Sequence, residues 1–472
     1  MAPPGGGHLS PYRHLLKEPA FVRFLLAGTF AFAGPTTGLI VVQTQIAEQY
    51  GAGGAGFAAL ALSLLGLSAT LPTLGAALVS GTLADRYDRR RILKVAEAVA
   101  LAAAAALAVV LAVDPRAAVA VPVGGPAGLT LPVWLLLTFP IWAALTAAVT
   151  VFRPTFNAAL PEIVDSRDLG AANGLLFASA VGLGAATQIL TGLLDQRWGP
   201  APALLVPVVL FSGSLLFLLR LGESAGGPRG PRRQSFLTEA QEGYRYLSRR
   251  RELLAVTVAA LGINFLSALA FVELAEYSSF YLKETPSFLG LLYGIGTLGA
   301  GLGALAVTRL HYERRLGRLL GAMTLGMGAC VAGLALTRSA AVAVADMFLF
   351  GMFPGMFQTA FQTGVQATVP NELLGRVFAA DEVGSYAFVP VGQYAGGLST
   401  YSFGIPATYL GAGIGMGVIG LGLLTVPVVG RFRFDPDPRA VQPPPGALVE
   451  NPLRGPFLEE PPTPPSVAGA TP

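Results

Sequence analysis

Twelve runs of mainly apolar residues constrain what this chain of 472 residues can fold into. A helix of about 20 residues spans the hydrocarbon core of a bilayer, which is roughly 30 Å thick. The runs are continuous and rich in Leu, Ala and Gly, without the alternation of a membrane β-strand, so they predict helices rather than a barrel. The predicted spans are residues 21–46, 56–82, 92–113, 130–151, 170–194, 202–221, 252–281, 286–308, 316–336, 340–366, 374–399 and 404–430. The fold class expected is therefore an all-α polytopic membrane protein.

The composition excludes several other classes of protein. Hydrophobic residues make up 53% of the chain and charged residues only 12%, more apolar surface than an ordinary soluble core buries. The net charge of +4 is scattered at the ends of apolar runs, which argues against a nucleic-acid partner. The single cysteine, Cys330, excludes internal disulfides, and three dispersed histidines predict no metal site. We expect no cofactor.

The distribution of Lys and Arg predicts the orientation. With the N-terminus placed inside the cell, 27 basic residues fall on the inner side and 4 on the outer side. Under the positive-inside rule both termini are cytoplasmic, in the plasma membrane. Residues 1–7 carry no basic charge, so we expect no cleaved signal peptide and an uncleaved first span.

The spans divide into two halves. We expect a cytoplasmic segment at 1–20, a six-helix bundle at 21–221, a linker at 222–251, a second bundle at 252–430 and a disordered Pro-rich tail at 431–472. In the linker, Phe236, Ala240, Tyr244 and Leu247 fall on one helical face, which predicts a helix lying on the inner membrane surface. A plain solvated linker is the alternative.

Short motifs recur in the same order in both halves. Gly81-x-Leu83-Ala84 returns as Gly303-x-Leu305-Ala306, and Phe139-Pro140 returns as Phe353-Pro354. Leu169-Gly170 returns as Leu374-Gly375, and with that spacing Gln188 and Gly192 fall on Gln393 and Gly397. The shared order predicts a duplicated six-helix unit, the arrangement by which secondary transporters expose a central site to each side in turn.

A dense charged turn joins the second and third spans. It reads Gly81-Thr-Leu-Ala-Asp-Arg-Tyr-Asp-Arg-Arg-Arg-Ile-Leu93. The turn resembles the loop motif of the major facilitator superfamily, Gly-x-Leu-Ala-Asp-Arg-x-Gly-Arg-Arg-x-x-Leu, which stands between helices 2 and 3 of that family. Asp88 replaces the usual glycine, and this variant is more similar to the branch of siderophore (enterobactin-type) and macrolide exporters.

The resemblance implies a transporter of two pseudo-symmetric bundles with a conformational latch. Asp85 would face the start of the eleventh span near Arg376, where a carboxylate meets the positive end of the helix dipole. Arg86 and Arg89 would pair with Glu162, Asp165 or Asp168. The latch residues are Gly81, Asp85, Arg86, Asp88, Arg89, Arg90, Glu162 and Arg376. The alternative is that these charges only fix the topology of the turn.

Charged residues inside spans are costly and therefore indicate function. Asp346, Asp381 and Glu382 are the candidates for proton coupling. The alternative is that Asp381 or Glu382 simply pairs with Arg376. Glu273 and Glu276, late in the seventh span, are expected at the outer mouth.

Amides and prolines indicate the substrate cavity. Gln358, Gln362 and Gln366 recur every fourth residue and share one helical face. Prolines interrupt the first, fourth and tenth spans, and paired interruptions indicate a binding site. The cavity candidates are Pro35, Gln43, Pro140, Asn264, Pro354, Gln358 and Gln362. Because no basic residue is predicted deep in these spans, the cavity suits uncharged or cationic amphipathic compounds better than compact anions.

These features predict a secondary active transporter that is not an enzyme. No Gly-x-x-x-x-Gly-Lys-Ser/Thr motif is present, so an ion or solute gradient must supply the energy. We expect proton-coupled efflux of drug-like or siderophore-like molecules by a monomer in the lipid bilayer, with antiport inferred from the resemblance. An importer, a lipid flippase, a membrane-embedded enzyme and a non-transporting receptor are the alternatives.

Overall fold

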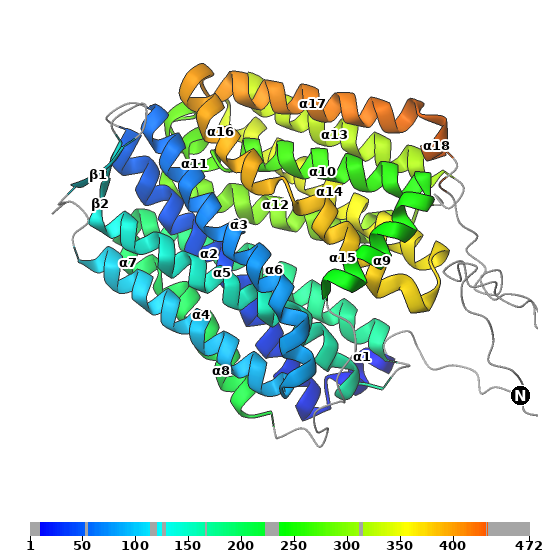
Figure 1. Ribbon diagram of the computed structural model, residues 1–472. Coiled ribbons are helices and arrows are strands. Elements are labelled where there is room, and N and C mark those ends of the chain that lie inside the picture. Colours follow the sequence, from blue (N-terminus) through cyan, green and yellow to red (C-terminus); the bar gives the residue numbers. More distant parts are fainter. Residues whose placement is uncertain are drawn as a thin grey trace, which may run out of the picture.

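The computed structural model describes residues 10–51, 55–113, 120–124, 129–165, 168–221, 236–310, 315–430 and 432, and this part of the chain is almost entirely helical (Figure 1). In the N-terminal half the elements are α1 Ser10–Leu15, α2 Pro19–Gly51, α3 Ala55–Arg86, α4 Arg89–Ala112, β1 Ala120–Gly124, β2 Leu129–Pro132, α5 Val133–Ala159, the 3-10 turn η1 Leu160–Glu162, α6 Leu169–Trp198, α7 Pro200–Ala203 and α8 Leu205–Leu219. The remaining elements are α9 Phe236–Arg249, α10 Arg251–Phe271, α11 Leu274–Glu276, the π-turn η2 Tyr277–Tyr281, α12 Pro286–Val307, α13 Leu316–Leu336, α14 Ala340–Thr368, α15 Asn371–Tyr386, α16 Val389–Phe403, α17 Ile405–Thr425 and α18 Pro427–Gly430.

Within the described ranges, 11 helices are long and apolar enough to cross a membrane. The remaining predicted span, 374–399, is divided between α15 and α16, which have 16 and 15 residues. Neither piece reaches the length of a membrane span alone, whereas the two in succession do. The helical membrane fold predicted from the apolar runs is therefore confirmed.

The helices are not interrupted at the three prolines at which the sequence predicted interruptions. Pro35, Pro140 and Pro354 all lie inside continuous helices, α2, α5 and α14, so the predicted interruptions at these residues are wrong. A proline removes one backbone hydrogen bond, and neighbouring groups in a membrane bundle satisfy the freed carbonyl. Inside the predicted spans, breaks occur between α7 and α8, between α10 and α11, between α15 and α16 and between α17 and α18. In the last two a proline stands at the start of the second helix, Pro390 in α16 and Pro427 in α18.

The helices form two bundles that lie side by side, with α2–α8 in one and α10–α17 in the other (Figure 1). Helices α1, α9 and α18 lie at one end of the molecule, which we call the terminal end. The antiparallel pair β1–β2, with Val121 opposite Leu131, lies at the other end, which we call the hairpin end. This hairpin was not predicted, because its strands are short and lie within a connection between spans.

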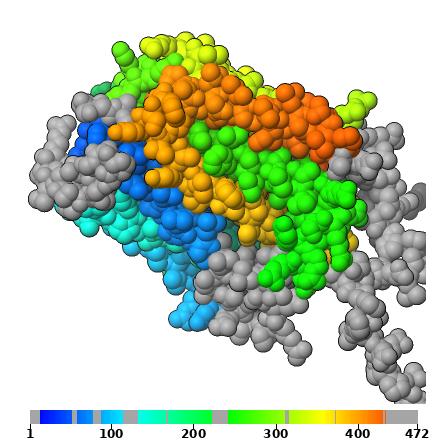
Figure 2. All heavy atoms as spheres, turned by 45° about the horizontal axis from the view of Figure 1, so that its top comes forward, coloured from blue at the N-terminus to red at the C-terminus, as the bar shows by residue number. Residues whose placement is uncertain are grey.

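Two helix pairs form most of the contact between the bundles. Helix α3 packs on α16, and α6 packs on α12. Figure 2 shows the first of these pairs, with the blue surface of α3 against the amber surface of α16. Helix α2 also contacts α11 and η2 near the hairpin end. We call this boundary between the bundles the seam.

Helix α9, in the linker, packs on α15 at the terminal end. A side chain on Gly243 would collide with the backbone carbonyl of Arg376, so the helices touch backbone to backbone there. Leu247 is buried while Tyr244 is 61% exposed, so the predicted apolar face is shared between protein and surroundings. The predictions made for residues 1–9, 222–235, 431 and 433–472 concern positions outside the described residues.

Candidate functional site

The charged turn is built on a capped helix start. Asp88 is the N-cap of α4, and its Oδ1 accepts a hydrogen bond from the backbone N–H of Arg91 at 3.0 Å. Aspartate is among the preferred N-cap residues, because its side chain satisfies a free N–H of the first turn. This explains the aspartate where the family motif has glycine. Gly81, Asp85 and Arg86 lie in the last two turns of α3, and the side chains of Asp85 and Arg86 are outside what the structure describes.

Two arginines of the expected latch have visible partners. Arg89 Nη1 lies 2.9 Å from Glu162 Oε1 and donates a hydrogen bond to the carbonyl of Ala158 at 2.6 Å. Arg376 Nη1 lies 2.6 Å from Oε2 of Glu242, on the linker helix α9. The first contact joins the start of α4 to the end of α5, and the second joins α9 to α15. Glu242 was not among the residues predicted.

Asp381 and Glu382 of α15 have surroundings that differ from the ion pair with Arg376 considered above. Asp381 Oδ1 accepts a hydrogen bond from the hydroxyl of Thr257, on α10, at 2.6 Å. Glu382 is exposed. Asp346 is partly buried on α14, and its carboxyl lies against Gly333 of α13, where a Cβ would come within 2.6 Å of Oδ2. Asp346 therefore lies on a different helix from the neighbouring candidates Asp381 and Glu382.

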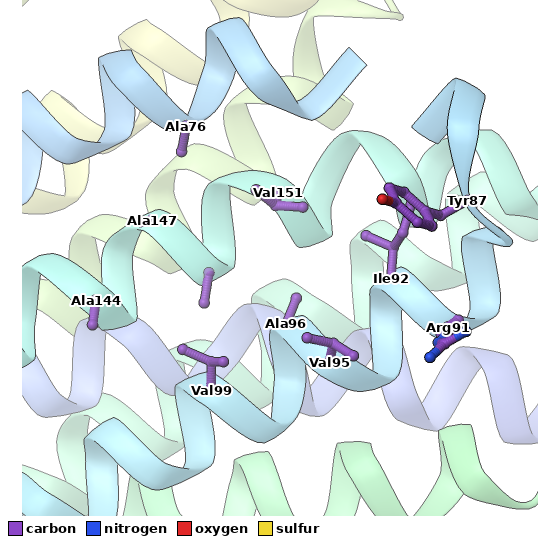
Figure 3. Close-up of a pocket in the computed structure, with 11 residues that line it drawn as sticks. Ala76, Tyr87, Arg91, Ile92, Val95, Ala96, Val99, Ala144, Ala147 and Val151 are labelled. Atoms are coloured by element: carbon purple, nitrogen blue, oxygen red, sulfur yellow. The ribbon is translucent and has the colours of Figure 1, made fainter. Parts of the chain in front are cut away.

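A pocket of about 580 Å³ lies beside the charged turn (Figure 3). Small apolar side chains of α3, α4 and α5 line it, including Ala76, Val99 and Ala147, with Tyr87 and Arg91 at one end. All of these residues belong to the N-terminal half. None of the predicted cavity residues lines this pocket, so it is not the central cavity between the halves.

At the seam, equivalent residues of the two halves make equivalent hydrogen bonds. Thr70 of α3 donates to Gln393 Oε1 of α16 at 2.8 Å. Thr297 of α12 donates to Gln188 Oε1 of α6 at 2.9 Å. The two glutamines are the pair that the repeated motifs aligned. A third contact joins α2 to α12. The predicted cavity residue Gln43 accepts a hydrogen bond from the hydroxyl of Tyr293 at 2.9 Å.

Glycines bring the seam helices together toward the hairpin end. A Cβ on Gly192 would lie 3.1 Å from the Cα of Gly290, and a Cβ on Gly290 would lie 2.5 Å from the carbonyl oxygen of Gln188. A Cβ on Gly397 would collide with the hydroxyl of Ser63, which donates to the carbonyl of Gln393 at 2.8 Å. Small residues at such contacts let helix backbones approach closely in membranes. The halves are therefore in tight contact at the hairpin end.

Glu273 and Glu276 lie in this closed region, not at an exposed mouth. Both residues are 0% exposed, which corrects the expectation from their late position in the seventh span. The break after α10 and the π-turn η2 fold this segment inward, against α2 and α3. Their spacing of three residues in an apolar run was a usable signal, because residues i and i+3 share one helical face. Two further buried acids that the sequence reading missed are Glu97 on α4 and Asp195 on α6.

Toward the terminal end, polar side chains of the C-terminal half remain exposed. Gln358, Gln362 and Gln366 of α14 are exposed, as are Glu382 and Tyr386 of α15. Amide side chains at this depth are costly against lipid, so we interpret the glutamine face as lining a water-accessible space between the halves. Asn264 of α10 donates to the carbonyl of Ser385 at 3.1 Å, which holds α10 against α15.

One basic residue was missed in this region. Helix α5 continues to Ala159, beyond the predicted end of the fourth span, so Arg153 lies within it. Its guanidinium lies 5.8 Å from the ring centre of Phe32, and Arg153, Asp381 and Glu382 each interact electrostatically with Tyr386 of α15. The prediction that the deep positions of these spans carry no cation stays a prediction, because Arg153 lies two residues beyond the predicted end of the fourth span.

A family model described as transmembrane secretion effector matches residues 43–458. The multidrug efflux pump Tap of Mycolicibacterium fortuitum is 26% identical over 433 residues, which is 87% of this chain and 96% of that protein. The Mycobacterium tuberculosis protein of the same name is 26% identical over 445 residues, covering 90% and 97%.

The fold is shared with solved transporters of low sequence identity. A nucleoside transporter superposes with a TM-score of 0.64 at 11% identity, covering 86% of this chain and 99% of its own. A D-xylose–proton symporter superposes with a TM-score of 0.61 at 14% identity, covering 87% and 98%. Because the matching family and relatives are transporters, the alternative of a membrane-embedded enzyme is excluded.

Proposed function

We propose that this chain, which belongs to the transmembrane secretion effector family of the major facilitator superfamily, exports amphipathic small molecules in exchange for protons by alternating access. The observation that carries the proposal is the contrast between the two ends of the seam. The hairpin end is closed by glycine contacts and buried polar residues, whereas polar side chains toward the terminal end stay exposed. With the terminal end in the cytoplasm, this is a transporter open to the cell interior.

The symmetry of the seam supports alternation. Gln188 and Gln393 hold their partner helices through equivalent hydrogen bonds, one on each side of the seam. If the halves rock about these mid-helix contacts, closing one end separates the other. Transporters built from repeats use such rigid-body movement around a fixed central site.

The exposed face toward the terminal end supports an amphipathic substrate. Gln358 and Gln362 supply hydrogen-bonding groups that pair with neutral molecules, while Asn264 and the prolines Pro35, Pro140 and Pro354 remain candidates for shaping the space. Arg153, Asp381 and Glu382 all act on Tyr386, so the arginine in this space is accompanied by two acids and would select compact anions less strongly than a lone cation. The relatives named multidrug efflux pumps support the same class of substrate.

The latch residues support the idea that contacts at the terminal end control the balance between the two conformational states. Asp85 and Arg86 would stabilise the state in which the terminal end is closed, with Gly81, Asp88 and Arg90 shaping the turn. The Arg89–Glu162 and Arg376–Glu242 ion pairs hold the elements on which that latch acts. Carboxylates and helix starts contribute roughly 0.3–2 kcal/mol in such contacts, enough to change the balance of two states.

Transport in inverted membrane vesicles tests the proposal. An imposed pH gradient, acidic inside the vesicle, should drive accumulation of a fluorescent amphipathic cation such as ethidium, and a protonophore should abolish it. Vesicles without the protein are the control. Accumulation only under the opposite gradient would indicate an importer, and movement of fluorescent phospholipid but not of dye would indicate a flippase; either result would overturn the proposal.

A further inference from the structure

Glu273 and Glu276 form a sealed pair of acids where α10 gives way to α11, at the hairpin end. Both are 0% exposed, and in the part of the chain that the structure describes none of their carboxyl oxygens has a hydrogen-bond partner. The two carboxyl groups lie against each other. Two ionised carboxylates in such a place would repel each other and lack solvation, so they cannot both stay charged.

The groups around the pair offer hydroxyls rather than positive charge. The hydroxyl of Tyr409, itself 0% exposed and without a hydrogen-bond partner among the described residues, lies close to both carboxyls, and Ser63 lies beside Glu273. The titratable groups that face this cluster are Tyr277 and Tyr281 of η2, Tyr293 of α12, Tyr409 of α17 and Asp346 of α14, which faces Tyr277. Among the described residues, no Lys or Arg lies beside either carboxyl.

The lack of space around the two carboxyl groups limits what can bind between them. Protein atoms enclose both side chains completely, so the closed site has no room beside them for a water molecule or a metal ion. A proton needs no such room. It would neutralise one carboxyl and give the other a hydrogen-bond donor, which removes the repulsion without any added volume.

We propose that a proton held by the Glu273–Glu276 pair is what allows the hairpin end to close, an inference that rests on the proposed proton exchange. Closing the end without the proton would bury two unpaired charges, so the deprotonated pair favours the state open at the hairpin end. Protons arriving from outside would then favour closure of this end in the empty transporter, and exchange is completed when the proton leaves toward the cell interior before the hairpin end reopens.

Labelling of a single cysteine tests this without relying on transport. Phe57 of α3 packs edge-on against Tyr401 of α16 with ring centres 6.4 Å apart, so a cysteine at Phe57 reports closure. The reporter is Phe57→Cys in a Cys330→Ser background, which removes the only native cysteine. The rate of modification by a thiol-reactive dye is measured from acidic to alkaline pH and corrected for the reactivity of a free thiol. We expect protection at acidic pH and faster labelling at alkaline pH.

The variant Glu273→Gln with Glu276→Gln should stay protected at every pH, because neutral amides are buried without charge. Glu284→Gln, a partly exposed acid on the following segment, is the matched control and should keep the pH dependence. If the double variant is not recovered, each single glutamine variant should show a weakened pH dependence. Unchanged pH dependence in these variants, or a wild type that responds to sodium instead of pH, would overturn the inference. Failure of pH-driven dye transport with intact pH-dependent labelling would instead reject only the proposed function.

Discussion

Arg89 joins two helix ends through one side chain. It pairs with Glu162 and donates to the Ala158 carbonyl, while its side chain is 22% exposed and that of Glu162 26%. An ion pair this accessible to solvent is worth about 1 kcal/mol or less. Such an amount is too small to decide whether the protein folds, but it is large enough to change the populations of two states several-fold.

We therefore predict that Arg89→Ala leaves the amount of folded protein unchanged and slows pH-driven transport about fivefold, the change expected for about 1 kcal/mol. Size-exclusion chromatography measures the folded protein and vesicle uptake measures transport. Lys94→Ala, which removes a positive charge from the same helix, is the control and should transport normally. Equal slowing by both variants would mean that only the net charge of α4 matters.

Individual residues show which side-chain positions could be predicted from the sequence and which could not. The pairing of Arg89 with a carboxylate after the fourth span was among the options predicted, because the motif carries its own spacing. Glu273 and Glu276 were placed at the outer mouth, because position along a span says nothing about an inward fold of its last turn. Arg153 was missed because helix α5 continues about two turns beyond the apolar run, and hydropathy marks the bilayer rather than the helix.

The tight contact between α6 and α12 makes a prediction at the level of elements. Gly192→Val should separate these helices at the hairpin end, because even a Cβ would lie 3.1 Å from Gly290 Cα. The variant should favour the state open at the hairpin end, label faster at the Phe57→Cys reporter and transport more slowly. Gly182→Val on the same helix is the control, since a Cβ there meets nothing within 4 Å. Similar labelling in both variants would contradict a role for this contact in closure.

The contact between α9 and α15 makes a second prediction. Glu242→Arg and Arg376→Glu should each slow transport, because each places like charges at a separation now occupied by an ion pair. The double swap restores opposite charges and should recover most of the wild-type rate. Vesicle uptake by the four proteins measures this coupling. A double swap no better than Arg376→Glu alone would show that Arg376 acts through another partner, such as the expected Asp85.

The sequence predicted the number and position of the membrane helices better than it predicted where a helix is interrupted. Long apolar runs locate helices well, since each must bury its backbone in the bilayer. The break at Ala387–Phe388 precedes Pro390, a helix-start signal inside a continuous apolar run, whereas the turn at Val272–Glu273 carries no proline and depends on packing against neighbouring helices. Pro35, Pro140 and Pro354 were predicted as breaks from the sequence alone. They are not breaks, because the surrounding helices of the bundle tolerate a proline inside a helix.

At the scale of the whole molecule, the repeated motifs correspond to repeated contacts. Gln188 and Gln393, aligned from sequence spacing alone, both accept a threonine hydrogen bond across the seam. Gly192 and Gly397, four residues further on, both lie where the opposing helix leaves no space for a side chain. The same kind of helix contact thus occurs twice between the halves. If each half moves as a rigid body, as proposed, neither contact separates at the hairpin end without the other.

This coupling predicts that holding one side of the seam stops the whole cycle. Cysteines at Phe57 and Tyr401, in the Cys330→Ser background, should be bridged by a short reducible bis-methanethiosulfonate reagent, because the native rings are 6.4 Å apart. The bridged protein should lose dye transport, and a reducing agent should restore it. Each single-cysteine protein treated in the same way should transport normally. Full transport by the bridged protein would mean that the hairpin end does not open during the cycle, and rocking of the two halves about the seam would have to be abandoned.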